Sequence, residues 1–265
     1  MNSVIKSFLM AFSSYSLFPG SSAKPEKENT RFILLFVPII GAIIGVILYF
    51  WSKAWPYLCD YMILPASLCV VVPMILSGGS HLESFVKTVD ALCAHKPREK
   101  KMAILADSQS GYFAIIVCIS YFLLAVGIWS EMPIDGMPIL AIGFVLSRAL
   151  FGLSILTLKH AKESKCTVYV PDKAAKGVEI IILAVVFVAC ALFMVKIDAR
   201  VGCACIIGAV VAFVYYWISS YKHFGGITED TAGYFLQICE IIIPLAALLA
   251  FRSPISSFLA YEQFM

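Results

Sequence analysis

Charged side chains are scarce in this chain. Asp, Glu, Lys and Arg make up 14% of its 265 residues and 61% are hydrophobic, whereas soluble domains carry about 25% charged and about 45–50% apolar residues. The mean hydropathy is +0.90. No polar interval is longer than Ser77–Gly111, so the composition excludes a second, soluble domain. We therefore expect one integral membrane domain over residues 1–265, and we predict the lipid bilayer, not a nucleic acid, as a partner.

Closely spaced cysteines are also lacking. Nine cysteines are scattered singly, mostly inside apolar runs, and only Cys203 and Cys205 stand close together. That spacing fits neither a zinc knuckle nor a thioredoxin-like redox pair, so we interpret the cysteines as small apolar residues of a packed interior. The first 18 residues contain one lysine and no small-residue cleavage site, so no signal peptide is predicted.

Long apolar runs dominate what is present. Residues 4–18 are too few to cross a bilayer, which takes about 20 helical residues, so we predict a helix lying in the membrane interface. Seven longer runs predict an all-α, polytopic fold with about seven transmembrane helices. The predicted spans are Phe32–Trp51, Met62–Ser77, Tyr112–Trp129, Pro138–Leu158, Val178–Lys196, Val201–Tyr221 and Tyr234–Phe251. Gly41 and Gly45 lie four residues apart in the first span, a spacing that permits close helix approach.

Lysine and arginine are distributed unevenly over the connecting segments. If the segment before the first span is cytoplasmic, alternation of the spans places residues 20–31, 78–111, 159–177 and 222–233 on the same side. These segments hold three, five, five and one basic residues, fourteen in all, whereas four basic residues fall on the other side. Because cytoplasmic loops are enriched in Lys and Arg, we predict a multi-pass protein of the cytoplasmic membrane whose polar loops face the cytoplasm.

The longest polar stretch lies on this face and carries spaced carboxylates. Glu83, Lys87 and Asp90 are four and three residues apart, so a helix presents all three on one face. Carboxylates in this pattern can hold Mg²⁺, which takes one or two protein carboxylates together with phosphate oxygens and water. A solvated amphipathic turn explains the same spacing. The neighbouring basic run Lys96–Lys101 either contacts anionic lipid or collects an anionic nucleotide.

Two further polar features interrupt the apolar runs. Arg148 lies near the middle of a predicted span, where a charge costs roughly 2.5 kcal/mol or more on insertion scales, so it is a functional candidate. The structural alternative is an ion pair with Glu240, about two turns into the last span. The loop Gly225–Gly233 precedes that span and carries Asp230. Such a loop can bind phosphate through backbone N–H groups, and its acid can cap the helix or bind a metal.

Taken together, these segments resemble the adenosylcobinamide-GDP ribazoletransferase family, also called cobalamin synthase. The segments that carry the likeness are Phe36–Gly45, Gly78–Ala91, Asp107–Gly111, Ser147-Arg148, and Gly225–Asp230 with Gly233 and Glu240. For the second segment the family pattern reads Gly-Gly-x-His-Leu-Asp-Gly-x-x-Asp-Thr-x-Asp-Gly/Ala. The likeness extends from about Phe8 to Leu249, which is nearly the whole chain.

The resemblance implies a reaction, its partners and a set of site residues. α-Ribazole, or its 5′-phosphate, attacks the phosphorus attached to cobinamide in adenosylcobinamide-GDP, so that GMP leaves and adenosylcobalamin or its phosphate forms, with Mg²⁺ as cofactor. Other cobalamin-assembly proteins are implied as further partners. The implied catalytic residues are His81, Glu83, Asp90, Asp107 and Arg148. The implied metal ligands are Glu83, Asp90 and Asp230. The implied substrate contacts are Gly78, Gly79, Thr88, Gly111, Ser147, Gly225, Gly226, Thr228, Asp230 and Glu240.

Five positions depart from the family pattern. Glu229 stands where the family has glycine and Gln237 where many members have an acid, and the other three lie within Gly78–Ala91. Glu83 replaces an aspartate, Ser84 a glycine and Lys87 an aspartate, so a positive charge stands where the resemblance implies a metal ligand. At an effective dielectric constant of about 20, a unit charge about 4 Å away is worth about 4 kcal/mol, so a weakened metal site and an altered activity are expected. An active enzyme further predicts that five acids converge, namely Glu83, Asp90, Asp107, Asp230 and Glu240. The alternatives are a catalytically silent paralogue that binds a corrinoid or partners B12-assembly proteins, and a small-molecule transporter, although the chain lacks the paired repeats typical of transporters.

Overall fold

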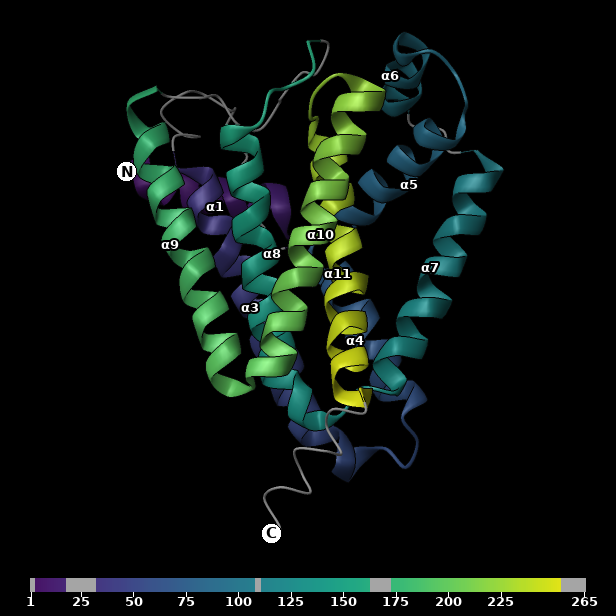
Figure 1. The fold of residues 1–265 in the computed structure, drawn as a ribbon, viewed down its shortest axis with the longest axis vertical. Helices are drawn as coiled ribbons and strands as arrows, with labels where there is room; N and C mark the ends of the chain where they lie inside the picture. Colours follow the sequence, from purple (N-terminus) through teal and green to yellow (C-terminus); the bar gives the residue numbers. More distant parts are fainter. Residues whose placement is uncertain (1–2, 18–31, 108–110, 163–172, 254–265) are drawn as a thin grey trace.

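Helices form all the regular elements in the part of the chain that the structure describes. The computed structural model describes residues 3–17, 32–107, 111–162 and 173–253, and the chain passes up and down through a bundle (Figure 1). Within those ranges no strand is present, and the β-type pairing there is an isolated parallel bridge between His160 and Ile227. The predicted all-α fold is confirmed.

Six helices among the described residues are long and apolar enough to cross a membrane by themselves. They are α3 (Ile33–Leu58), α7 (Tyr112–Ser130), α8 (Met137–Thr157), α9 (Lys173–Ile197), α10 (Ala199–Phe224) and α11 (Glu229–Arg252). A short 3-10 helix, η1 (Ile134–Gly136), leads into α8. Each long helix overlaps one predicted span, so the chain is a multi-pass membrane protein.

The remaining predicted span, Met62–Ser77, is broken. α4 (Ile63–Leu76) ends just before the pair Gly78-Gly79, and α5 (Ser80–Cys93) continues at an angle of 93° to it. Both glycines have left-handed backbone, with φ of 66° and 72°, a conformation that glycine adopts without the steric cost of a side chain. α4 and α5 lie in the lower and upper halves of Figure 1. Counted as one bent span, they bring the candidate spans of the described residues to seven.

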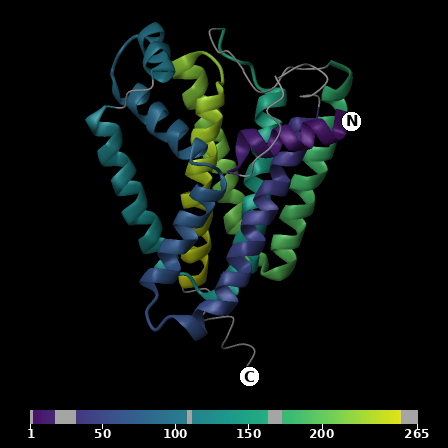
Figure 2. The ribbon, with the colours of Figure 1, turned by 180° about the vertical axis from the view of Figure 1, so that it is seen from behind.

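Two shorter helices complete the set. α1 (Ser3–Tyr15) has 13 residues and runs across the bundle instead of along it (Figure 2). Its Phe8 ring meets Phe36 of α3 edge-on, with 5.4 Å between the ring centroids. This length and direction are those expected of an interfacial helix. α6 (Arg98–Ala106) lies at the end of the bundle where α10 finishes.

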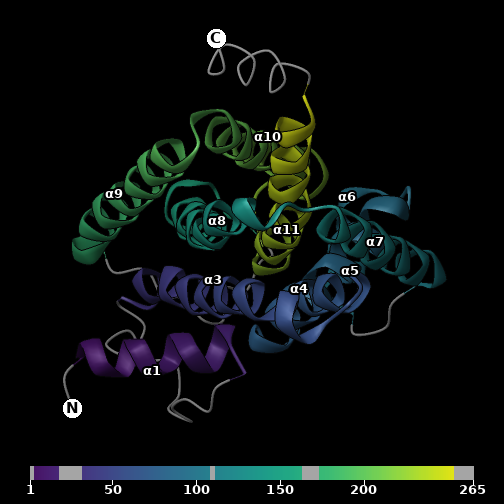
Figure 3. The same ribbon diagram turned by 90° about the horizontal axis from the view of Figure 1, so that it is seen from below.

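α8 lies at the centre of the bundle, with α3, α9, α10 and α11 packed around it (Figure 3). Glycines allow the closest of these approaches. A Cβ on Gly41 would lie 2.7 Å from Cδ of Arg148, and a Cβ on Gly45 would overlap the backbone of Ala141. The four-residue glycine spacing therefore brings α3 onto α8 and leaves room for a buried arginine.

One end of the bundle collects the polar connections. The ends of α8 and α10, the starts of α9 and α11, and helix α6 all lie at the top of Figure 1, whereas α11 finishes at the bottom. We call the upper end the α6 end. The described parts of the loops predicted to share one face thus lie at this end, whereas residues 18–31, 108–110 and 163–172, on which part of that prediction falls, lie outside the described residues.

Candidate functional site

The first polar site lies where α5 packs against α11. A Cβ on Gly233 of α11 would lie 2.6 Å from Oγ and 2.7 Å from Cβ of Ser84 on α5. Both distances are too short for real Cβ contacts, so the two helices meet at this depth because residue 233 is glycine. Ser84 fills the space between them, where the resemblance had implied a glycine.

Charged groups gather around this contact at the α6 end. Nζ of Lys87 lies 2.6 Å from Oε1 of Glu83 on the same face of α5. The Asp230 carboxylate, on the first turn of α11, has as neighbours Lys87, Glu229, Glu83 and the Ser84 hydroxyl. We call these five residues the α5–α11 cluster. The start of α11, which follows the loop Gly225–Gly233, thus lies beside the Glu83 segment of α5.

Asp90 has a different partner. Its Oδ2 accepts a hydrogen bond from the backbone N–H of Gly111 at 3.0 Å, and a Cβ on Gly111 would overlap the same carboxylate. Gly111 is the residue before α7, so Asp90 ties the second half of α5 to the start of α7. Asp107 follows the last residue of α6. Thr88 is buried and its hydroxyl has no hydrogen-bond partner in the described part of the chain.

The loop between α10 and α11 is held by backbone geometry and by α6. Gly225 has φ of 71° and ends α10 in the left-handed region, and the Arg98 guanidinium of α6 lies directly over it. Gly226 packs on the backbone at His160. The Thr228 hydroxyl accepts a hydrogen bond from the Thr231 N–H at 3.0 Å and so caps α11. The resemblance had implied that Thr228 contacts substrate, but its hydroxyl is engaged in this cap.

A second polar centre lies inside the bundle. NH2 of Arg148 donates to Oε1 of Glu240 at 3.1 Å, as the structural alternative for these residues predicted. NH1 of Arg148 donates to the Phe144 carbonyl at 3.2 Å. Gln237 donates to Oε2 of Glu240 at 3.4 Å and also to the Tyr121 hydroxyl. A charge that would be costly alone in an apolar interior is thus paired and hydrogen-bonded.

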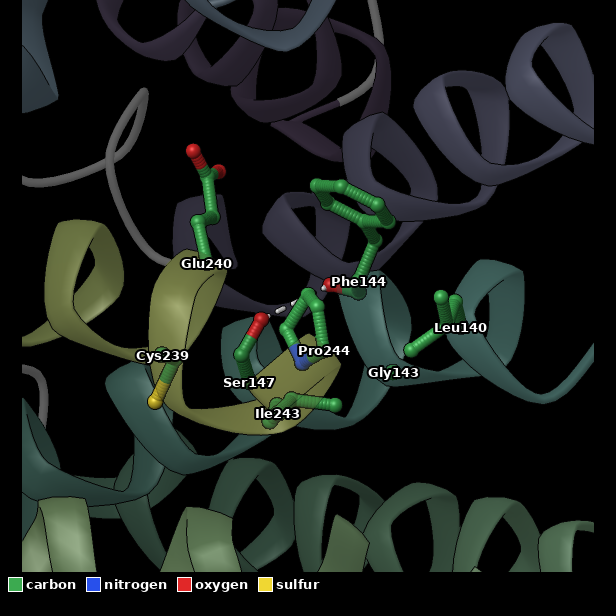
Figure 4. Close-up of a pocket in the computed structure, with 8 residues that line it drawn as sticks. All are labelled: Leu140, Gly143, Phe144, Ser147, Cys239, Glu240, Ile243 and Pro244. Carbon is green, nitrogen blue, oxygen red and sulfur yellow. Dashed lines mark hydrogen bonds between the residues drawn. The ribbon is translucent and has the colours of Figure 1, made fainter. Parts of the chain in front are cut away.

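Glu240 also lines two small pockets. One lies between α8 and α11 and is bounded mainly by apolar side chains (Figure 4). In it the Ser147 hydroxyl donates to the Phe144 carbonyl of its own helix at 3.2 Å. The other lies between α4, α7 and the same pair of helices. His81, at the start of α5, is 4% exposed, with Phe151 at 6.4 Å between ring centroids and Arg148 as its charged neighbour. His81 therefore faces the interior and not the α5–α11 cluster.

The chain matches the family described as cobalamin-5-phosphate synthase over residues 7–248. It belongs to that family. A relative from Lachnoclostridium phytofermentans is 33% identical over 246 residues, which cover 93% of this chain and 94% of the relative. Relatives from Clostridium botulinum (strain Alaska E43) and Clostridium perfringens (strain 13) are 28% and 27% identical, over 91% and 89% of this chain and 96% and 94% of their own lengths. All three are named adenosylcobinamide-GDP ribazoletransferase. No solved structure matches the chain.

The metal ligands that the resemblance implied do not converge on one point in the structure. In the described residues no group of three or more His, Cys, Asp or Glu side chains could hold a metal ion. Glu83 is paired with Lys87, Asp90 is bound to Gly111, and Glu240 is paired with Arg148. The expected convergence of five acids on one point is therefore wrong, and a protein-held ion on Glu83, Asp90 and Asp230 does not fit this arrangement.

Sequence reasoning did not predict two hydrogen-bond partners in the polar centre inside the bundle. Gln237 and Tyr121 complete the hydrogen bonding around Glu240, but Gln237 was noted only as a departure from the family pattern and Tyr121 was not a candidate. A signal for Gln237 was present, because an amide three residues before Glu240 on an apolar helix shares its face. Tyr121 carried no such signal, since only packing of α7 on α11 brings it there.

Proposed function

We propose that this chain is an adenosylcobinamide-GDP ribazoletransferase acting at the α6 end of the bundle. The observation that carries the proposal is the family match over residues 7–248, together with relatives of that name that align over about nine-tenths of the chain. The α5–α11 cluster supports the same assignment, because it brings charged groups from two segments into one place at a membrane end.

In the proposed reaction a ribose hydroxyl oxygen of α-ribazole, or of its 5′-phosphate, bonds to the phosphorus attached to cobinamide. The phosphoanhydride bond to GMP breaks, and the hydroxyl proton passes to a base. Adenosylcobalamin, or its phosphate, and GMP are the products. Transfers of this kind depend on positioning of the reactants and on neutralising charge on the phosphoryl oxygens. The Arg98 guanidinium over Gly225 supplies positive charge beside the loop.

We assign the base to Asp230. It lies on the first turn of α11, half-buried, and it faces the Ser84 hydroxyl. Glu83 is less suited because its carboxylate is paired with Lys87. His81 is less suited because it is buried against Phe151, away from the open end. A base must lie within hydrogen-bond reach of the proton that it accepts.

Three finer statements belong to the same proposal. Mg²⁺ accompanies the diphosphate of the substrate and is not held by three protein ligands, which agrees with its preference for phosphate oxygens and water. The protein resides in the cytoplasmic membrane with its α6 end toward the cytoplasm, as the excess of lysine and arginine there suggests. Association with other cobalamin-assembly proteins stays a prediction. Labelling cysteines introduced at positions 100 and 135 with a membrane-impermeant maleimide, in cells and in inverted vesicles, tests the orientation.

The proposal is tested with the purified chain in lipid nanodiscs. Adenosylcobinamide-GDP, α-ribazole and Mg²⁺ are supplied, and GMP and cobalamin are measured together. The wild type is expected to form both in equal amounts, and Asp230→Asn is expected to lose about 10²-fold or more of the rate because general-base catalysis is removed. Asp135→Asn is the matched control, since Asp135 is exposed in η1 at the opposite end. Folded wild type that releases no GMP would overturn the proposal in favour of a silent paralogue.

A further inference from the structure

Lys87 is the cation of the α5–α11 cluster. Its ammonium is 2.6 Å from Oε1 of Glu83, one turn before it on α5. The negative charge of Asp230 on α11 is near enough to attract the same ammonium. Ion pairs four residues apart are common on exposed helix faces and need no function. Lys87 differs from such a pair because a second helix, α11, packs on α5 and places Asp230 among its charged neighbours.

The Lys87 side chain lies where α5 packs against α11, and it is more covered than its partner Glu83. Its side chain is 20% exposed, whereas that of its partner Glu83 is 65% exposed, so Lys87 is the more covered member of the pair and Glu83 lies at the rim of the helix junction. The junction itself depends on Gly233 and Ser84. An ammonium has three N–H donors. One donates to Glu83, which leaves donors for an oxygen of a ligand at the exposed part of the side chain.

Lys87 also explains why the acids do not form a metal site. A divalent ion between Glu83 and Asp230 would lie beside an ammonium of the same sign, and like charges a few ångströms apart repel strongly at the dielectric constant of a protein surface. Independently of Lys87, the described part of the chain contains no set of three or more His, Cys, Asp or Glu side chains placed to hold a metal ion.

We propose that the Lys87 ammonium takes the place of a protein-held divalent cation in this site, pairing with Glu83 beside Asp230 and binding a phosphate oxygen of the nucleoside-diphosphate-linked substrate. Lys87 is then a phosphate-binding residue, and the identity of that ligand rests on the proposed function. The pairing of Lys87 with Glu83 does not rest on it, since it follows from their 2.6 Å contact.

The first test measures Mn²⁺ binding by electron paramagnetic resonance on the substrate-free chain in nanodiscs. Lys87→Asp is expected to bind one Mn²⁺ per chain at least about tenfold more tightly than the wild type, because a repulsive charge becomes an attractive one. Adding Glu83→Gln to that variant is expected to abolish the gain. Lys53→Met, altered at an exposed lysine near the end of α3, is expected to match the wild type. Wild type that binds Mn²⁺ as tightly as Lys87→Asp would overturn the proposal.

The second test measures GDP binding in EDTA by isothermal titration, with GDP as the diphosphate probe. Lys87→Met is expected to raise the dissociation constant about tenfold, the loss of one charge-assisted hydrogen bond, and Lys87→Arg is expected to recover most of it. Equal GDP affinity in wild type and Lys87→Met would refute the phosphate contact. Wild type that binds GDP through Lys87 and yet releases no GMP from adenosylcobinamide-GDP would refute the proposed function and leave this inference standing.

Discussion

Glu240 provides the most quantitative prediction. In the wild type its carboxylate lies 3.1 Å from NH2 of Arg148, and the two side chains are 11% and 1% exposed. Replacing Glu240 by glutamine keeps the shape and removes the charge, so the guanidinium stays buried without its counter-ion. Breaking a buried pair by removing one partner costs about 3–5 kcal/mol. We expect the free energy of unfolding of Glu240→Gln to fall by about that amount.

The chain contains a matched control for this experiment. Arg252 and Glu131 form a second Arg–Glu pair between helix ends, but their side chains are 62% and 55% exposed. An exposed pair contributes about 0–1 kcal/mol, so Glu131→Gln is expected to change the free energy of unfolding by no more than that. Each variant removes the carboxylate charge that pairs with an arginine, so the difference between their losses of unfolding free energy isolates the effect of burial.

The measurement is reversible unfolding in mixed detergent micelles, followed by circular dichroism. A double variant, Arg148→Met with Glu240→Leu, removes both charges and is expected to recover much of the stability that Glu240→Gln loses, because the desolvation cost disappears with the charges. Equal, small losses in Glu240→Gln and Glu131→Gln would refute the reasoning, since Arg148 would then be solvated or paired elsewhere.

Two smaller predictions concern the α6 end. Gly233→Ala places a methyl group 2.6 Å from Oγ of Ser84, so we expect it to lower the melting temperature and the transferase rate, and Ser84→Gly in the same chain to restore both; a Gly233→Ala chain with the wild-type melting temperature would show that α5 and α11 are less closely packed. Thr228→Ala removes the cap of α11 and is expected to cost about 0.5–2 kcal/mol of unfolding free energy, whereas Thr228→Ser, which keeps the hydroxyl, is expected to cost less. Equal losses in these two variants would argue against the cap.

Local patterns predicted most of the helices and one of the polar contacts. Runs of apolar residues specify spans because the bilayer leaves backbone groups no partner outside a helix, and six predicted spans appear as unbroken helices. Arg148 and Glu240 were paired correctly, since two charges in apolar spans have few alternatives. The bend at Gly78-Gly79 was not predicted: the two glycines turn the chain between α4 and α5, whereas the resemblance had implied only substrate contacts for them.

By itself, the sequence determined that this is an all-α, multi-pass chain of the cobalamin-5-phosphate synthase family, because hydropathy and ordered motifs are properties of the residues in order. The tertiary structure alone decided which acids meet. Glu83, Lys87 and Asp90 share one face of α5, yet Glu83 and Lys87 pair with each other and have Asp230 as a charged neighbour, whereas Asp90 binds Gly111. The sequence shows which residues share a helical face, but not which helix packs against that face. The packing of α11 and α7 on α5 decides this.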